Sequence, residues 1–440
     1  MNTPSQSVNA WIMLPASSTD ASYQNLINYK VFNSTDMISL CWVGAVPTSS
    51  STVPTGDGSS YTLYTKFTSD LQAIVADARA INPGIKILVM LGYGGNELND
   101  IFSGYPQSEW SAQATQFANN VVAYLQQYNL NGFDIDWEYP LSTDSNADQV
   151  QLILSALRTA FDAQTAVYYL TMSPATPDNL NGPNINATLD FMTLQLYSGF
   201  TERSQFTGPN SLGVDANLLA YGSKFESTGD GSIAPYQTAN SAYQQMQQGG
   251  YSITTQWRLN SGDYQYEQAQ QMMLAELVYG APGNQFDDSP IIGAAGNPLI
   301  SQIVIRSGEV LDAIQVTNTG QFCDPATNCT PLTYALMQHG GNGGGASTVA
   351  IAAGDMITEI SGFTGTWYGW NVVLQIILKT ASGKVYGPFG SMAGSTSKTA
   401  FSYAAPAGQS IVAFNGTTVQ VPEAAGGESF VVQTLNVTFA

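Results

Sequence analysis

Three carboxylates occupy alternate positions in one short apolar stretch of the chain. In LNGFDIDWEYP, residues 130–140, large apolar residues separate Asp134, Asp136 and Glu138. Successive side chains of a β-strand point to opposite faces, so the three acids would share one face of a strand. Neighbouring carboxylates raise one another's pKa, which lets one of them keep a proton near neutral pH. The pattern is therefore suited to acid and base catalysis.

The position of this stretch in the chain indicates whether its acidic face is wet or buried. Long helical patterns flank it at residues 109–129 and 144–164. This order is typical of a parallel barrel, in which the inward face of each strand is packed and dry. Charges confined there cost several kcal/mol unless they share protons or hydrogen bonds. The order therefore disfavours a solvated acidic face, and we predict a catalytic row.

Glu138 is the acid nearest the C-terminal end of the predicted strand, where the active sites of parallel barrels open. Beside Asp136, it is suited to giving a proton to a leaving oxygen near neutral pH. Glycoside hydrolysis commonly uses a second carboxylate as nucleophile, about 5 Å from the acid. Asp136 instead points the same way from the same strand, about 7 Å along it. This geometry favours a nucleophile supplied by the substrate, such as the N-acetyl group of a sugar.

The first part of the chain alternates short apolar runs with longer helical patterns, which predicts an α/β fold with a parallel sheet. Eight strands, most of them followed by a helix, within about 250 residues are what a (β/α)₈ TIM barrel requires. The connections after the first two strands are the least clearly helical. The predicted strands are residues 9–15, 37–46, 85–91, 132–139, 167–175, 191–198, 217–225 and 252–260.

The second part of the chain has a different pattern. Gly and Pro in YGAPGNQ, residues 279–285, end the last helix. Beyond them, short alternating strands separated by Gly-rich turns predict an all-β domain. We place the two domains at residues 1–283 and 284–440, and we expect the glycine run 340–345 to be a tight connection between strands. The clearest strands are predicted at 301–307, 312–317, 372–380 and 431–439.

The acidic stretch resembles the active-site signature D-G-x-D-x-D-x-E of the family 18 glycoside hydrolases, which are chitinases and their relatives. Asn131 stands in the place of the first Asp. The resemblance implies that Glu138 is the general acid and base, that Asp136 orients and stabilises the N-acetyl group, and that Asp134 supports Asp136. It also implies that no metal or organic cofactor is needed.

Two further segments resemble substrate-facing parts of that family. KILVMLGYGG resembles its third-strand S-x-G-G pattern, with Gly92 in the place of Ser, and implies substrate contacts at Tyr93 and Gly94. Glycines there would let the backbone lie close to the catalytic strand, although a plain turn is an alternative. LTMSPA resembles the fifth-strand segment that carries a substrate-facing Met, here Met172, with a core Met as the alternative.

The last barrel strands resemble the family as well. LQLYSG implies that Tyr197 hydrogen-bonds the N-acetyl carbonyl and that Gln195 contacts the sugar. TTQWRLN implies that Trp257 forms the floor under the reacting sugar, with a buried core Trp as the alternative. Only about 30 residues separate Glu226 from Trp257, too few for an inserted domain that would deepen the cleft. We therefore expect a shallow, open groove.

Residues 286–440 resemble jacalin-related lectins, whose fold is a three-sheet β-prism. Segments such as ISQIVIRSGEVLDAIQV and HGGNGGGASTVAIAAGDMITEISGFTG carry the resemblance. The Asp of the mannose-type G-x-x-x-D loop is missing from GGESFVVQTL. The domain is therefore expected either to bind glycans, with backbone contributions from Gly340 and Gly341, or to serve as a structural module.

Composition and charge narrow the possible partners. The chain has 12 Lys and Arg against 32 Asp and Glu, a net charge of -20, which argues against nucleic acid and anionic membranes. No apolar stretch of about 20 residues predicts a membrane span. The N-terminus lacks the pattern of a secretory signal, so we expect a removed signal or another export route. Cys323 and Cys329 are either a loop disulfide or two free thiols.

The sequence thus predicts a secreted endo-acting chitinase that uses substrate-assisted retaining catalysis and carries a lectin-like accessory domain. Its expected partners are chitin or other glycans that contain N-acetylglucosamine. One rival is an endo-β-N-acetylglucosaminidase acting on N-glycans, which would use the same acid and the same sugar. The other is a non-catalytic chitinase-like glycan-binding protein or toxin, which the retention of Glu138 disfavours.

Overall fold

The computed structural model divides into two compact units, Met1–Asp263 and Tyr264–Ala440. The division falls before the boundary predicted at residue 283, because helix α10 (Glu267–Tyr279) contacts elements of the second unit. Gly94, Cys323 and Cys329 lie outside the described residues. The structure describes residues 2–15, 20–28, 30–49, 60–93, 97–225, 239–261, 267–279, 285–292, 296–322, 330–422 and 428–440.

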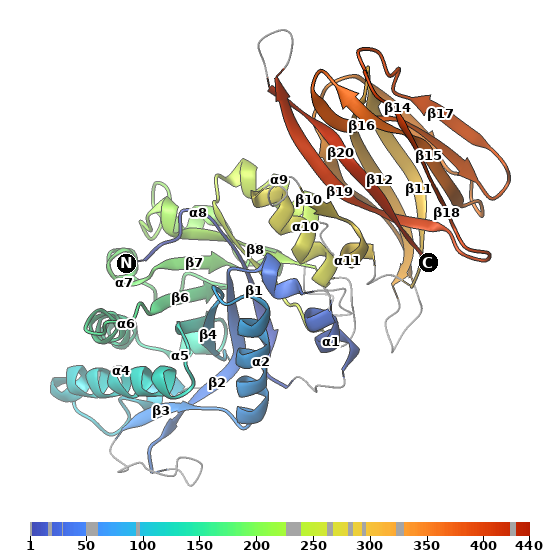
Figure 1. Ribbon diagram of the computed structural model, residues 1–440. Helices are drawn as coiled ribbons and strands as arrows, with labels where there is room; N and C mark the ends of the chain where they lie inside the picture. The colour runs from blue at the N-terminus through green and yellow to red at the C-terminus, as the bar shows by residue number, and fades with distance from the viewer. Residues whose placement is uncertain are drawn as a thin grey trace. The chain divides into compact units, whose positions relative to one another are not determined.

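The first unit is a closed barrel of eight parallel strands, which confirms the predicted fold (Figure 1). The order around the barrel is β1-β9-β8-β7-β6-β5-β4-β2, and β1 closes the ring by pairing with β2. A short antiparallel strand, β3 (Tyr61–Tyr64), extends β2 and was not predicted. The barrel strands are β1 (Ser7–Met13), β2 (Met37–Pro47), β4 (Lys86–Leu91), β5 (Gly132–Trp137), β6 (Tyr169–Pro174), β7 (Phe191–Leu194), β8 (Leu219–Lys224) and β9 (Ile253–Trp257).

The longest helices of this unit form where apolar residues recur three or four positions apart. On α4 these residues include Phe117, Val121 and Leu125, all buried. After β5 and the short α5 (Leu141–Asp144), helix α6 is capped by Asn146, whose side chain accepts hydrogen bonds from two backbone N–H groups of the first turn. No helix in the described ranges is long and apolar enough to cross a membrane. The longer helices are α1 (Ala21–Asn28), α2 (Thr68–Ile81), α4 (Trp110–Gln127), α6 (Ala147–Asp162) and α9 (Ala239–Gly249).

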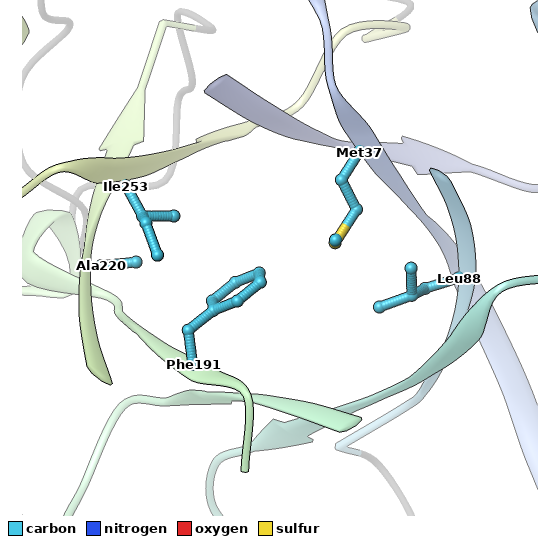
Figure 2. Close-up of a cluster of buried hydrophobic side chains, with 5 residues drawn as sticks. All are labelled: Met37, Leu88, Phe191, Ala220 and Ile253. Atoms are coloured by element: carbon cyan, nitrogen blue, oxygen red, sulfur yellow. The ribbon is translucent and has the colours of Figure 1, made fainter. Parts of the chain in front are cut away.

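A layer of apolar side chains fills one end of the barrel. Figure 2 shows Met37, Leu88, Phe191, Ala220 and Ile253 pointing inward from different strands. Met37, Phe191 and Ile253 are the first residues of their strands, so the layer lies toward the N-terminal ends. Each of the five side chains is at most 4% exposed. The barrel is therefore closed at this end, and the opposite end is left for a functional site.

The second unit contains three antiparallel sheets, as the predicted β-prism requires. Their strand orders are β10-β19-β20, β13-β12-β11-β14 and β17-β16-β15-β18. The glycine run connects β13 to β14, as predicted. The strands are β10 (Gln285–Asp287), β11 (Gly296–Ser307), β12 (Leu311–Phe322), β13 (Thr330–Gly340), β14 (Gly345–Ala350), β15 (Ile357–Trp367), β16 (Trp370–Thr380), β17 (Val385–Phe389), β18 (Thr399–Ala404), β19 (Ile411–Pro422) and β20 (Glu428–Phe439).

A cluster of titratable groups is buried in the second unit, where α10 contacts β13. His339 Nε2 lies 2.7 Å from Asp288 Oδ1, and the Phe286 ring stacks on the imidazole. Burial raises the pKa of Glu276 to about 7 and also raises the pKa of Asp288. Burial lowers the pKa of His339, but its hydrogen bond to Asp288 and the negative charges nearby outweigh burial, so the net shift is upward.

We expect the second unit to lose stability as the pH rises. Between an unfolded pKa of 4.5 and a folded pKa of about 7, folded Glu276 holds a proton that the unfolded chain has lost, so stability falls across that window. Asp288 and His339 shift in the same direction, and Asp287 adds a further negative charge. Glu276→Gln should raise the melting temperature of the full chain in calorimetry near pH 8 and change it little near pH 4. Equal shifts at both pH values would contradict this account.

Candidate active site

Strand β5 turns two of the predicted acids into the barrel. Asp134 and Asp136 are only 3% and 4% exposed, whereas a solvated face would leave them in water. The strand ends at Trp137, so Glu138 follows it directly and is half-buried. The row thus rises along one strand from the barrel interior to the C-terminal mouth.

Asp134 is the deepest acid of the row, and hydrogen-bond donors surround it. Thr171 Oγ1 donates to Asp134 Oδ1 at 2.9 Å, and Trp11 Nε1 donates to Asp134 Oδ2 at 3.2 Å. Ser173 Oγ lies 3.3 Å from the same Oδ2. Burial raises the pKa of Asp134, and the hydrogen bonds from Thr171, Trp11, Ser39 and Ser173 oppose this rise. Asp134 is therefore a fixed acceptor beneath the other two acids.

Asp136 and Glu138 form a coupled pair above it. Burial raises the pKa of Asp136 well above its ordinary value, and the charge of Glu138 and a hydrogen bond to Glu138 add to the rise. Asp134 contributes in the same direction, whereas the indole N–H of Trp42 opposes it. The sequence predicted such coupling, and the structure gives the raised pKa to Asp136. The pair can therefore hold a proton between its two carboxyl groups at neutral pH.

Gln195 holds the pair in place from the loop that follows β7. Its Nε2 lies 2.7 Å from Glu138 Oε1, 3.0 Å from Asp136 Oδ1 and 3.0 Å from the Ser173 carbonyl oxygen. The side chain is buried, and its amide donates toward both carboxylates. The sequence suggested only a sugar contact for this residue. Its bonds to the acids could not be foreseen, because they depend on the order β5-β6-β7 in the sheet and on the path of this loop.

A cavity of about 340 Å³ opens above the pair. Its acidic lining residues, within the described chain, are Asp136, in β5, and Glu138, which directly follows that strand. Of the other predicted site residues, Tyr93, Gln195, Tyr197 and Trp257 also line it. Its walls are mostly aromatic and are formed by Trp11, Trp42, Tyr93, Tyr139, Tyr197, Phe200 and Trp257.

Three tryptophans form the packed side of this cavity. The ring centroid of Trp257 lies 5.9 Å from that of Trp11 and 6.0 Å from that of Trp42. Trp42 in turn meets Tyr93 edge-on at 5.9 Å. Because each ring is held by its neighbours, this surface is pre-formed for a flat ligand. Trp257 is partly buried: it lines the cavity and also packs against the buried cluster that contains Trp11 and Tyr197.

Trp42 was missed by the sequence analysis, although a signal for it lay at Gly92. A Cβ atom at Gly92 would lie 3.1 Å from the Trp42 ring, so a side chain there would crowd the indole. The glycine was interpreted as letting the backbone approach the catalytic strand. In the structure, the side chain that Gly92 packs against is that of Trp42.

Two predicted site residues lie away from the cavity. Met172 is fully buried and does not line it. Its neighbours Thr171 and Ser173 turn toward Asp134, so Met172 occupies the other face of β6. This placement fits the core alternative. Asp134 also lies below the cavity, consistent with a supporting position.

The predicted lectin glycines use their backbone groups inside the second unit. The N–H of Gly341 donates to the carbonyl oxygens of Asp312 and Phe430, at 3.1 and 2.9 Å. Gly341 O accepts from Gln338 Nε2. Gly340 has a φ of +114° and packs so closely that a Cβ atom would lie 2.1 Å from the Asp312 carbonyl oxygen. These glycines therefore shape the connection between β13 and β14.

Fold and site together define a (β/α)₈-barrel protein with a coupled acid pair at the base of an aromatic cavity. Residues 18–269 match the family model for Glycosyl hydrolases family 18, and residues 276–426 match the model for the Jacalin-like lectin domain. The first match spans more than half of the chain. The chain therefore belongs to the glycosyl hydrolases of family 18 and carries a jacalin-like lectin domain after the barrel.

Similar proteins share only part of this chain. An endochitinase of Brugia malayi is 36% identical over 99 residues, which are 22% of this chain and 18% of that protein. Chitinase 1 of Aphanocladium album is 32% identical over 142 residues, which are 30% of this chain and 32% of that protein. The chain thus spans a third or less of the length of either relative. A class V chitinase from Nicotiana tobaccum is 14% identical in sequence, with a TM-score of 0.43, and the match covers 62% of this chain and 99% of that structure.

Proposed function

We propose that the protein is an endo-acting chitinase that works outside the cell and cuts β-1,4 linkages between N-acetylglucosamine units. The observation that carries the proposal is the coupled pair, Asp136 and Glu138, bound by the Gln195 amide at the base of an aromatic cavity. Membership of family 18 and the endochitinases among its relatives support the same conclusion.

Glu138 is the proton donor in this proposal. It lies at the mouth of the barrel, lines the cavity and shares a hydrogen bond with Asp136. A positioned carboxylic acid speeds cleavage because it protonates the leaving glycosidic oxygen as the bond breaks. Since Gln195 fixes one oxygen of Glu138, the carboxyl group reaches a bound sugar in a single orientation.

The substrate itself supplies the nucleophile. Two-carboxylate retaining enzymes place a second acid across the scissile bond. Here the acidic lining residues of the described chain are Asp136, in β5, and Glu138, directly after it, so both come from the same wall of the cavity. The N-acetyl carbonyl oxygen would attack the anomeric carbon as the bond between this carbon and the leaving oxygen breaks. This attack forms an oxazolinium ion. Asp136 would orient the acetamido N–H and stabilise the positive charge, and Tyr197 would hydrogen-bond the acetyl oxygen.

The second step returns the catalyst to its starting state. After departure of the leaving group, the Glu138 carboxylate takes a proton from water, and that water attacks the anomeric carbon of the oxazolinium ion. The ring opens and the N-acetyl group is restored. Two displacements at one carbon give retention of configuration, so the first product is the β-anomer. The lectin-like unit would hold the enzyme near a glycan surface.

Product analysis tests this function. On N-acetylglucosamine oligomers of defined length, we expect internal cleavage with shorter oligomers as the first products. The same protein should release no glycan from a high-mannose glycoprotein. Release from the glycoprotein alone would identify an endo-β-N-acetylglucosaminidase acting on N-glycans. Absence of products from every substrate would indicate a binding protein.

Gln195→Met should lower kcat by about 10- to 100-fold, because it removes the charge-assisted hydrogen bonds that position Glu138. KM should change much less, since the change acts through the acid and not through most sugar contacts. Steady-state kinetics on a soluble oligomer measures both constants. Gln126→Met, at an exposed position of α4, serves as the control. If KM rose and kcat stayed unchanged, Gln195 would be a sugar contact only.

A further inference from the structure

The indole N–H of Trp42 is a buried donor at the base of the cavity. Trp42 belongs to β2 and lines the cavity together with Asp136 and Glu138. Its Nε1 atom is buried and meets no acceptor at hydrogen-bond geometry within the described part of the chain. A buried donor without a partner costs stability, so it points to a state of the site in which the bond is made.

Neighbouring residues hold the Trp42 ring in one orientation. Its centroid lies 6.0 Å from that of Trp257 and 5.9 Å from that of Tyr93. Gly92 packs against the same ring, since a Cβ atom there would lie 3.1 Å from Trp42 Cγ. The indole cannot turn without disturbing these neighbours, because protein interiors leave little free space. The direction of the N–H is therefore fixed by packing.

Asp136 is the group on which this N–H acts. The N–H favours the charged form of Asp136 and lowers its pKa, although no hydrogen bond of regular geometry joins the two groups. Burial and the acids Glu138 and Asp134 outweigh this effect, so the pair keeps its proton. A carboxyl group that holds a proton is a weaker acceptor than a carboxylate, which is consistent with the unmade bond.

The proposed mechanism requires a negative charge on Asp136 when the oxazolinium ion forms, because a positive charge then develops on the acetamido group. A carboxylate in that state accepts strong hydrogen bonds from nearby donors. Gln195 Nε2 lies 3.0 Å from Asp136 Oδ1, but it is shared with Glu138 and the Ser173 carbonyl oxygen. The Trp42 N–H has no competing acceptor among the described residues.

We propose that Trp42 is a positioning residue for the reaction, whose indole N–H completes its hydrogen bond only when Asp136 carries a negative charge. The bond is unmade in the resting pair and made beside the oxazolinium ion, so it lowers the barrier without tightening substrate binding. The inference rests on the proposed function, because the charged state of Asp136 belongs to that mechanism.

Other titratable groups surround this part of the site. Burial raises the pKa of Cys41 well above its ordinary value, and the charges of Asp136 and Asp134 add to the rise, so the thiol stays neutral at neutral pH. The titratable and charged groups near Asp136 and Cys41 are Asp134, Glu138, Tyr197 and Arg258.

Trp42→Phe in the full chain keeps an aromatic ring and removes the N–H. It should lower kcat on a soluble N-acetylglucosamine oligomer by about tenfold and change KM by less than about twofold. The pH profile of kcat/KM should move to higher pH by about 0.5 to 1 unit, because the Asp136 carboxylate loses a donor. Thermal unfolding checks that the variant keeps the fold.

Trp110→Phe is the matched control, because the Trp110 indole N–H donates to the Tyr105 carbonyl oxygen at 3.2 Å, outside the cavity. It should keep the kcat and the pH profile of the wild type. The proposal is overturned if Trp42→Phe behaves like this control. A rise in KM with unchanged kcat also overturns it, since the N–H would then bind the sugar.

A second measurement does not depend on activity. In protein made with isotope-labelled tryptophan, the indole N–H resonance of Trp42 is the one missing from the Trp42→Phe spectrum. It should move downfield as the pH rises and Asp136 loses its proton, and Asp136→Asn should abolish this movement. A resonance that does not respond to pH overturns the proposal. A resonance that does respond, in a protein inert on every oligomer, would support the bond between Trp42 and Asp136 and contradict the proposed function alone.

Discussion

Glu138→Gln should lower kcat on N-acetylglucosamine oligomers by about 10²- to 10⁴-fold, the range assigned to a general acid. Glutamine keeps the size of the side chain and can still accept the hydrogen bond from Gln195. It cannot give a proton to the leaving oxygen. KM should stay close to that of the wild type, because the aromatic walls of the cavity are unaltered. Initial rates over a range of oligomer concentrations give both constants.

Glu109→Gln is the matched control, because Glu109 is an exposed acid that precedes α4. It should retain full activity. Full activity of Glu138→Gln would show that another group donates the proton. If the wild type and Glu138→Gln are equally inert on every N-acetylglucosamine polymer, the binding-protein alternative is favoured.

Asp136→Asn should have the second largest effect, a loss of about 10²- to 10³-fold in kcat, as for other groups that stabilise developing charge. The change removes the carboxylate that would stabilise the oxazolinium ion. It also removes the partner that helps the pair retain its proton. The alkaline limb of the kcat/KM profile should therefore move to lower pH.

Thermal unfolding separates this effect from damage to the fold. Burial raises the pKa of Asp136, so folded Asp136 holds its proton to higher pH than the unfolded chain does, and its contribution to stability falls as the pH rises. Asp136→Asn should thus melt no earlier than the wild type near pH 8, while its activity is lost. A lower melting temperature together with an unchanged pH profile would indicate a structural role.

The barrel and its acidic row could be predicted because both depend on local pattern. The alternation around Asp134 and Asp136 fixes the face on which they lie, whatever strand is adjacent. The eight parallel strands fall on the eight predicted segments, with differences of a few residues at their ends. Glu138 illustrates this limit, since the prediction placed it inside a strand that in fact ends at Trp137.

Contacts between elements could not be read in the same way. Trp42 lies on β2, which pairs with β4 in the ring, and Gln195 follows β7, which is two strands from β5, yet its amide bonds to Glu138. Met172 shows the opposite outcome, because its apolar character fits a core and a site equally well. In the second unit, Gly341 N–H donates a hydrogen bond to the carbonyl oxygen of Phe430. These residues are far apart in the chain, so the sequence does not predict this bond.

The most direct measurement compares hydrolysis of an N-acetylglucosamine tetramer with that of the same tetramer stripped of its acetyl groups. The proposed mechanism predicts rapid release of β-anomeric product from the acetylated tetramer and none above background from the other, since the latter lacks the attacking carbonyl. Equal rates on both, or an α-anomeric first product, would contradict the claim that Glu138 works with a nucleophile supplied by the sugar.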